Sequence, residues 1–375
     1  MRLTAPEVEH LRTRLHPPTT DRSTLARLLQ PFWNACLTLV PERVAPNLLT
    51  VLGSLAVAVP TALAMWWAPT WTEPVPAWLM ALQIAGIFLF QTLDALDGKQ
   101  ARKTGSSSPL GSWLDHALDI ATCQLMFIGG LITLGIGQGW HAWLLLAFIV
   151  VNNYLLHWES SHTKMLILGN GTSITDVQVT VMVVHALGIA LPSGFFMAPL
   201  STHVPALTGG AGADLTVAGV FVVVSTVGVG GLGAVASIVR ARSTDVPLFE
   251  SVRRTISVLV PILPTTAALF VIADHHAAVW LAGAALCVGV RSVGRVVLEN
   301  LLQRPAVTVD GPGVVVAAIA PLVVLVPAQA SSIASAAFVF GVAAIGWFFV
   351  DTARSLAAAL DEAIFTLPPA TAPSP

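Results

Sequence analysis

Four aspartates in the first third of the chain are spaced for chemistry on a charged substrate. Asp94 and Asp97 are three residues apart, so on a helix they share one face. Asp115 and Asp119 are four apart and share a face in the same way. Both pairs lie where long apolar runs begin or end, and ionisable residues at a membrane edge are costly and usually functional. Carboxylates gathered there suit hard divalent ions, so the spacing predicts a site for one or two Mg²⁺ or Mn²⁺ ions.

The composition places these aspartates in a membrane protein. Of the 375 residues, 55% are hydrophobic and only 10% are charged, which is too apolar for an ordinary soluble domain. We therefore expect an all-α polytopic membrane protein with about ten transmembrane helices. The apolar runs lie near residues 47–66, 76–96, 111–135, 139–157, 176–198, 215–239, 255–273, 277–298, 312–328 and 331–352.

An N-terminal interfacial amphipathic helix is expected before the first of these runs. Thr20 or Asp21 can cap its first turn, and Pro31 would kink it. Residues 1–20 are polar and are expected to be loose, and no secretory signal peptide is expected. The apolar side chains that fall on one face of the helix, and would lie in the membrane interface, are Leu25, Leu28, Leu29, Phe32, Trp33, Cys36 and Leu37.

The basic residues indicate the orientation of the bundle. With a cytoplasmic amino terminus, all 18 Lys and Arg fall in cytoplasmic segments or the adjoining helix ends, and the opposite loops carry none. The aspartates are then expected to face the cytoplasm. The net charge of −2 gives no indication of nucleic-acid binding, and no nucleic-acid partner is expected. Cys36, Cys123 and Cys287 show neither disulfide nor metal spacing and are expected to be packing residues.

Two short motif matches are set aside. Gly228-x-Gly230-x-x-Gly233 fits a dinucleotide fingerprint, but it lies in an apolar run, where small residues are expected to form a helix-packing surface. Asn170-Gly171-Thr172 fits a glycosylation sequon. The expected topology places this sequon in the cytoplasm, so we expect it to be unmodified.

The four aspartates belong to a longer pattern of eight fixed residues across 26 positions. At every fixed position it resembles the signature of the CDP-alcohol phosphotransferases. The segments DGKQARKTGSSSPLG at 97–111 and APNLLTVLG at 45–53 resemble the choline/ethanolamine phosphotransferase branch of that family. The resemblance covers about residues 20–180 and is weak beyond them. The pattern reads Asp94-x2-Asp97-Gly98-x2-Ala101-Arg102-x8-Gly111-x3-Asp115-x3-Asp119.

The resemblance implies a group transfer at a lipid surface. The hydroxyl of diacylglycerol would attack the β-phosphorus of CDP-choline or CDP-ethanolamine, releasing CMP and forming phosphatidylcholine or phosphatidylethanolamine. Asp94, Asp97, Asp115 and Asp119 would hold two Mg²⁺ or Mn²⁺ ions. Asp119 matches the general base proposed in related enzymes, but a metal-bound carboxylate is a weak base. His116, three residues earlier, could be the base instead, or it could have an orienting or packing role.

Several residues of the pattern are candidates for binding the CDP moiety. Gly98 and Gly111 lack side chains, so the backbone can approach the nucleotide closely. Arg102 can bind phosphate in a bidentate way, and Ala101 precedes it in the signature. Asn47 is expected either to hydrogen-bond the nucleotide or to cap its own helix.

The head-group and acceptor side is less well defined by the sequence. Trp113 offers an aromatic face to a quaternary ammonium, or else belongs to the interfacial belt. Glu159 and Asp176 could line the head-group or acceptor entrance, although Glu159 could equally lie in a solvated loop. Lys99 and Lys103 could touch substrate or meet lipid head groups.

We expect a cytoplasmic segment at 1–46, a catalytic core at 47–200, later transmembrane helices at 201–356 and a tail at 357–375. The later helices could form an acyl-chain chamber or a homodimer interface. Their intramembrane arginines also allow for a membrane transporter, although no internal repeat supports it. A different alcohol, such as inositol or glycerol phosphate, is the alternative substrate. A catalytically silent relative with a structural role is a further alternative, and the complete set of four aspartates argues against it. The expected membrane is the endoplasmic reticulum or Golgi in a eukaryote and the inner membrane in a bacterium.

Overall fold

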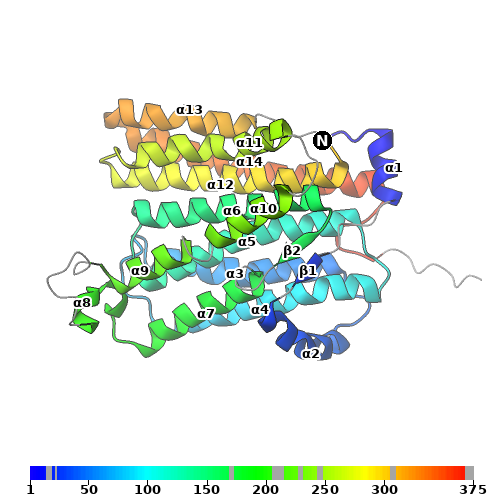
Figure 1. Cartoon of the computed structure of the whole chain (residues 1–375), viewed down its shortest axis with the longest axis horizontal. Coiled ribbons are helices and arrows are strands. Elements are labelled where there is room, and N and C mark those ends of the chain that lie inside the picture. The colour runs from blue at the N-terminus through cyan, green and yellow to red at the C-terminus, as the bar shows by residue number, and fades with distance from the viewer. Residues whose placement is uncertain are drawn as a thin grey trace, which may run out of the picture.

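The computed structural model describes residues 1–13, 19–21, 23–168, 173–204, 215–226, 231–242, 248–304 and 310–367. Within them the chain forms a bundle of long helices lying side by side (Figure 1). Its helices are α1 (Ala5–Thr13), α2 (Thr24–Leu39), α3 (Pro46–Trp67), α4 (Ala77–Lys103), α5 (Pro109–Leu134), α6 (Trp140–Thr163), α7 (Ile174–Ala190), η1 (Phe195–Met197), α8 (Leu200–His203), α9 (Val217–Val223), α10 (Gly231–Arg242), α11 (Leu248–Leu269), α12 (His275–Leu302), α13 (Gly311–Leu325), η4 (Pro327–Gln329) and α14 (Ala330–Leu360).

Seven helical runs in the described part of the chain are long and apolar enough to cross a membrane. They are α3, α4, α5, α6, α12, the run Val217–Ala241, of which α9 and most of α10 are described, and the run Pro327–Leu360 that contains α14. Three further apolar helices are shorter, at Ile174–Ala190, Val258–Leu269 and Gly311–Leu325. Each of the ten expected runs thus overlaps a described helix, and the chain is an all-α polytopic membrane protein.

The run expected at 176–198 is shorter than predicted because of its own sequence. α7 ends at Ala190, and Pro192 follows directly after its cap residue Leu191. Proline lacks an N–H group and disfavours helical backbone in the residue before it. Gly194 then adopts a φ of 85°, which turns the chain away from the helix axis.

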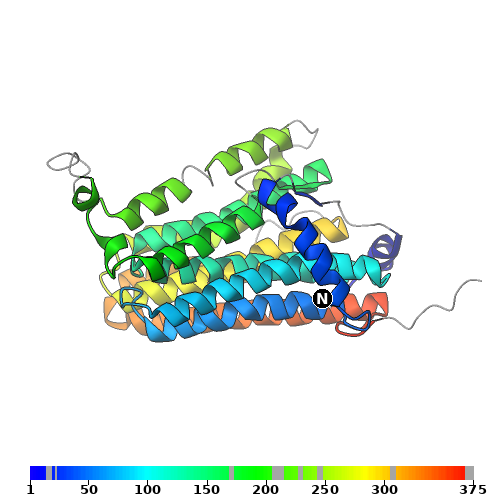
Figure 2. The same cartoon turned by 90° about the horizontal axis from the view of Figure 1, so that it is seen from below.

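The bundle has two groups of helices joined through its centre. α3, α4 and α7 pack together on one side, and α11, α12, α13 and α14 pack on the other (Figures 1 and 2). α5 and α6 lie between them and both contact α12. α3 and α4 approach closely at Gly86, where a Cβ would lie 2.1 Å from the Ala56 carbonyl oxygen. α4 is therefore held tightly against α3 along its length.

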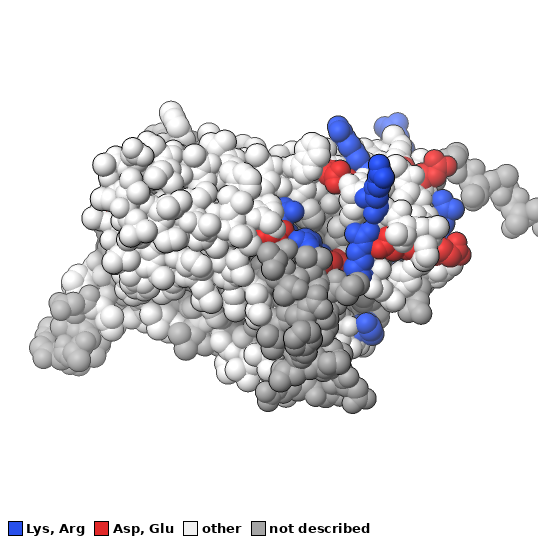
Figure 3. Space-filling model, turned by 90° about the horizontal axis from the view of Figure 1, so that it is seen from above, with Lys and Arg blue, Asp and Glu red and all other residues white. Residues whose placement is uncertain are grey.

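Many apolar side chains of the described helices are exposed, as expected of a surface that faces lipid. Large apolar side chains are exposed on several helices, for example Trp66 at 77% and Trp347 at 73%. The charged side chains visible in Figure 3 gather toward one end of the molecule, the end where α1 packs. This clustering agrees with the asymmetry of basic residues in the sequence, and the aspartates of α4 and α5 lie near the same end.

The amino-terminal residues differ from the expectation of a loose segment. α1 is a helix whose Leu11 is 3% exposed and joins the main buried cluster. The amino group of Met1 pairs with Asp351 at 2.5 Å, and Glu7 pairs with Arg304 at 2.5 Å. The expectation was wrong because it rested on local polarity, whereas these partners lie about 300 or more positions away in the sequence.

α2 begins at Thr24 and is capped by Ser23, whose side chain accepts a hydrogen bond from the Ala26 N–H. The predicted cap at Thr20 or Asp21 is therefore wrong. Asp21 instead belongs to the short strand β1 (Thr19–Asp21), which pairs in parallel with β2 (Leu166–Leu168). Pro31 lies inside α2.

Both faces expected of an interfacial helix are present on α2. Trp33 is 4% exposed and packs in a cluster with Leu49 and Leu96. Leu28 is 69% exposed, so it is available to lipid, and the interfacial placement of α2 stays a prediction. The sequon at 170–172 and the glycines at 228 and 230 lie outside the described residues.

Candidate functional site

The four aspartates come together from two adjacent helices. Asp94 and Asp97 lie near the end of α4, and Asp115 and Asp119 lie in the first turns of α5. Ligand atoms of Asp94, Asp97 and Asp115 all lie within 4.8 Å of one another, and those of Asp115, His116 and Asp119 do the same. Asp115 therefore belongs to both groups, which is the arrangement expected if two ions share a ligand.

A short turn sets this geometry by reversing the chain between the two helices. α4 ends at Lys103, and Gly105 then takes a φ of 65°. The Ser106 N–H bonds the Ala101 carbonyl at 2.9 Å, which closes the end of the helix. Pro109 starts α5 and Ser108 caps it by accepting from the Gly111 N–H at 3.1 Å. The signature residues on either side of the turn are thus brought face to face.

Two carboxylate oxygens of this cluster remain available to bind a cation. Asp97 is 6% exposed and accepts a hydrogen bond from the Thr50 hydroxyl at 2.6 Å. Among the described residues, Oδ1 of Asp115 and Oδ1 of Asp119 are buried without a hydrogen-bond partner. Buried anionic oxygens without partners are costly. The donor set, with its unpaired oxygens, fits one or two hard divalent cations.

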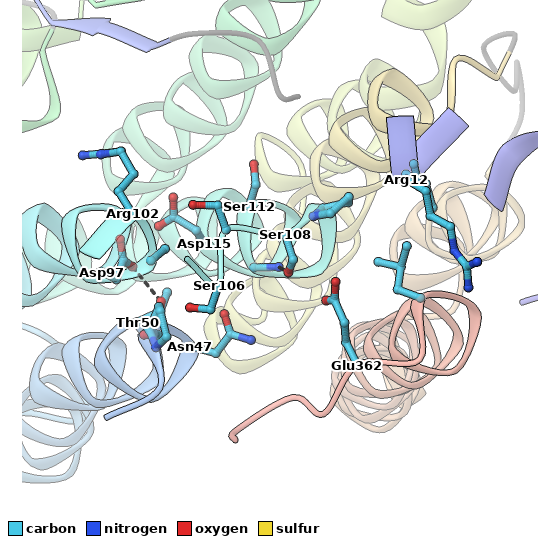
Figure 4. Close-up of a pocket in the computed structure, with 18 of the residues that line it drawn as sticks. Arg12, Asn47, Thr50, Asp97, Arg102, Ser106, Ser108, Ser112, Asp115 and Glu362 are labelled. Carbon is cyan, nitrogen blue, oxygen red and sulfur yellow. Dashed lines mark hydrogen bonds between the residues drawn. The ribbon is translucent and has the colours of Figure 1, made fainter. Parts of the chain in front are cut away.

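Two cavities meet at the carboxylates. The first, of about 420 Å³ and called the polar cavity below, is lined by several polar residues, among them Ser106, Ser107 and Ser108; Figure 4 labels Ser106 and Ser108. The second, of about 690 Å³, runs past Asp119 toward apolar side chains such as Phe127 and Ile149. Their shared wall is formed by Asp97, Gly98, Arg102, Ser107, Ser112 and Asp115.

The residues expected to bind the CDP moiety all line the first cavity: Asn47, Gly98, Ala101, Arg102 and Gly111. A Cβ on Gly111 would lie 3.1 Å from Oδ1 of Asn47, so this glycine keeps the cavity wall open. The expectation that Asn47 might cap its own helix is wrong, because α3 has no side-chain cap. The amide of Asn47 instead donates to the Ile364 carbonyl at 2.7 Å.

The three candidates for the head-group or acceptor side lie elsewhere. Trp113 is fully buried, with its ring 5.8 Å from that of Phe348, and it borders a small cavity of about 50 Å³. Glu159 is buried and forms an ion pair with Arg240, so the expectation of a solvated loop is wrong. Asp176 accepts from the Ser23 hydroxyl at 2.6 Å and so links α7 to the start of α2. None of the three is among the described residues that line either large cavity.

The two lysines near the signature also have structural partners. Lys99 donates to the side chains of Gln30 and Asn34, at 2.7 and 2.5 Å. Lys103 donates to the Val40 carbonyl at 3.0 Å. Both therefore fasten α2 to the end of α4.

Several residues at the site were not anticipated. Thr50 bonds Asp97 and lies three residues after Asn47, so helical spacing could have found it. Arg12 and Glu362 line the first cavity from the two ends of the chain, and no local signal marks them. His157 lies beside His116, with ring centroids 5.6 Å apart, and lines the second cavity.

Known proteins resemble the part of the chain that builds this site. Residues 43–208 match the family model described as CDP-alcohol phosphatidyltransferase. Cholinephosphotransferase 1 of Danio rerio is 34% identical over 168 residues, which are 44% of this chain and 44% of that protein. Cholinephosphotransferase 1 of Homo sapiens is 36% identical over 166 residues, covering 44% and 41%.

A Dictyostelium discoideum protein described as an uncharacterized CDP-alcohol phosphatidyltransferase class-I family protein 3 is 38% identical over 154 residues, covering 40% and 38%. The matched part of the chain spans less than half the length of each of these relatives. All eight residues of the signature fall inside the matched range. The chain therefore carries, in residues 43–208, a domain of the CDP-alcohol phosphatidyltransferase family.

Proposed function

We propose that the protein transfers phosphocholine or phosphoethanolamine from the CDP-alcohol to the hydroxyl of diacylglycerol. The products are CMP and phosphatidylcholine or phosphatidylethanolamine. The observation that carries this proposal is that four carboxylates converge where a cavity with several serine hydroxyls meets a second cavity that continues to apolar side chains. The similarity of the matched region to cholinephosphotransferases supports the choice of alcohol.

The polar cavity suits the nucleotide. Arg102 lines both cavities at their junction, where the two phosphates of the donor must lie, and a guanidinium binds phosphate oxygens in a bidentate way. Asp94, Asp97, Asp115 and Asp119 would hold two Mg²⁺ or Mn²⁺ ions. Divalent ions bound there would offset the charge of the pyrophosphate as its bridging bond breaks.

The second cavity, which continues past Asp119 to apolar side chains, suits the lipid acceptor. Phe127, Ile149, Leu156 and Val177 line it, and these side chains can accompany an acyl or glycerol portion up to Asp119. His116 lines the same cavity beside Asp119. One of these two side chains would take the proton of the acceptor hydroxyl as that oxygen attacks the β-phosphorus. The bond from the β-phosphorus to the bridging oxygen breaks, and CMP leaves into the polar cavity.

The topology proposed for this activity places the site on the cytoplasmic side. The Lys and Arg residues of the sequence fall in segments and helix ends on the same side of the expected spans as the aspartates, and the segments of the opposite side carry none. CDP-alcohols are available in the cytoplasm. In a eukaryote we place the protein in the endoplasmic reticulum or Golgi membrane, and in a bacterium in the inner membrane.

The deciding experiment measures CMP release by the purified protein in lipid with diacylglycerol, Mg²⁺ or Mn²⁺, and either CDP-choline or CDP-ethanolamine. Asp115→Asn should abolish release, because Asp115 belongs to both groups of ligands. Asp274→Asn is the matched control, since Asp274 caps α12 away from both cavities and asparagine also caps. No CMP release by the wild-type protein with either donor would refute the proposal.

The same preparation tests whether the protein is instead a transporter. Arg291 and Arg295, the intramembrane residues that favoured that function, are both paired with Asp310. In sealed vesicles a transporter would move the labelled CDP-alcohol across the membrane without forming CMP. The proposed enzyme would form CMP and labelled phospholipid at equal rates.

A further inference from the structure

The two ends of the chain together close one side of the polar cavity. Arg12 of α1 donates to the Ala359 carbonyl at 3.4 Å, and Ser355 donates to the Met1 carbonyl at 3.0 Å. Arg12 and Glu362 are both part of the cavity lining. α1 and the end of α14 thus form one wall, which lies outside the region matched by the family model.

Glu362 has a fixed place in this wall. Asp361 ends α14 with a φ of 58°, and the Glu362 N–H bonds back to the Ala357 carbonyl at 2.9 Å. Two residues later, the Ile364 carbonyl accepts from the Asn47 amide at 2.7 Å. Contacts on both sides therefore hold residue 362 against the start of α3.

The carboxylate of Glu362 points into the cavity at the end away from Asp97 and Arg102 (Figure 4). Burial raises the pKa of Glu362, and a hydrogen bond from Ser108 acts in the opposite direction. A carboxylate in this position repels the phosphates of a nucleotide. Ser108 already donates to this carboxylate, so a ligand group that approaches its remaining acceptor sites must be uncharged or cationic and must donate a hydrogen bond to be favoured there.

The two-cavity arrangement identifies which part of the donor meets this group. The phosphates lie at the carboxylate junction, and the leaving CMP extends into the polar cavity. Its base is then the part farthest from the junction, at the Glu362 end. Cytosine presents an exocyclic amine that donates hydrogen bonds, and carboxylates are suited to accept from it. Uracil presents a carbonyl oxygen at the same position, which a carboxylate repels.

We propose that Glu362 accepts a hydrogen bond from the cytosine amine and so determines the preference of the site for cytidine over uridine nucleotides. The proposal rests on the proposed function only in placing a CDP-alcohol in the polar cavity. It assigns a specificity-determining role to a residue outside residues 43–208, so proteins that match only that range need another group for the same purpose.

Nucleotide titrations of the full-length protein test the proposal without requiring turnover. Dissociation constants for CMP and UMP are measured by thermal-shift titration in detergent with Mg²⁺ for the wild type, Glu362→Gln and Asp361→Asn. The amide of Glu362→Gln keeps the shape and can donate to the uracil carbonyl. We expect the CMP-to-UMP preference to fall about tenfold, which is about 1.4 kcal/mol. Asp361→Asn removes a neighbouring exposed carboxylate and should keep the wild-type preference.

The outcomes separate this inference from the proposed function. An unchanged preference in Glu362→Gln, an equal weakening of both nucleotides, or a wild-type protein that does not distinguish them would overturn the inference. Equal weakening would indicate a contact to ribose, which both nucleotides share. CMP release from CDP-choline by the wild type is measured separately. If the wild type releases CMP while Glu362→Gln keeps the wild-type preference for CMP over UMP, only the role of Glu362 is refuted.

Discussion

Thr50→Val tests whether a hydroxyl on α3 holds the metal site in its working geometry. The Thr50 hydroxyl donates to Oδ2 of Asp97 at 2.6 Å, and the two residues are 4% and 6% exposed. Valine has nearly the same shape, so the change removes the donor and leaves the packing. A hydrogen bond to a charged acceptor contributes about 1.5–3 kcal/mol. Loss of such a partner behind a metal ligand typically costs about 10–100-fold in metal affinity or activity.

The assay is the dependence of CMP release on Mg²⁺ concentration. We expect Thr50→Val to raise the half-saturating concentration by about tenfold or more, with the maximal rate largely recovered at high Mg²⁺. Thr50→Ser, which keeps the hydroxyl and loses a methyl group, is the matched control and should stay close to wild type. If Thr50→Val and Thr50→Ser have the same half-saturating Mg²⁺ concentration, the hydrogen bond from residue 50 does not orient Asp97 and the reasoning is refuted.

Two further predictions use other contacts. Gly111→Ala places a Cβ 3.1 Å from Oδ1 of Asn47, so it should raise the KM for the CDP-alcohol and leave the KM for diacylglycerol unchanged. Gly346→Ala is the control: its Cβ meets nothing within 4 Å, so both KM values should stay at the wild-type level. The hydrogen bond from Arg304 lowers the pKa of Glu7 from 4.5 to about 2. Because folding lowers the pKa of Glu7, its interaction with Arg304 stabilises the folded state fully above pH 4.5. This stabilisation declines as the pH falls toward about 2. Glu7→Gln should therefore lower the Tm at neutral pH and flatten its decline in that window.

Results that would contradict these two predictions are equally specific. An unchanged donor KM in Gly111→Ala would show that the nucleotide does not approach the backbone at this turn. A Tm of Glu7→Gln that matches wild type at neutral pH would show that the pair with Arg304 adds nothing to stability. Solvent screening keeps the expected effect small, because the guanidinium side chain is 30% exposed.

Local patterns were sufficient for most of the helices and for the aspartate cluster. Helical spacing places Asp94 with Asp97, and Asp115 with Asp119, on single faces whatever the rest of the fold does. Gly105, Ser108 and Pro109 then mark the reversal that brings the two faces together. Apolar runs of the right length identify most spans, because a membrane requires nearly continuous apolar helices.

The same patterns failed where a side chain's partner is distant in the sequence. Trp113 was expected to face a head group or the interface, but it packs against Phe348 of α14. Glu159 was expected at an entrance or in a solvated loop, but it is buried in an ion pair with Arg240 of α10, which excludes the solvated loop. Neither partner could be anticipated, because the pairing of helices depends on packing across the bundle rather than on local spacing.

The sequence by itself determined that the chain is a polytopic membrane protein with a cluster of acidic residues at one end, because composition and helical spacing are local properties. Only the tertiary structure decided what surrounds that cluster. The amide of Asn47 meets the Ile364 carbonyl across 317 positions, and this contact helps to place Glu362 in the wall of the polar cavity. Contacts of this kind follow from the shapes of whole packed helices, and no short stretch of sequence encodes them.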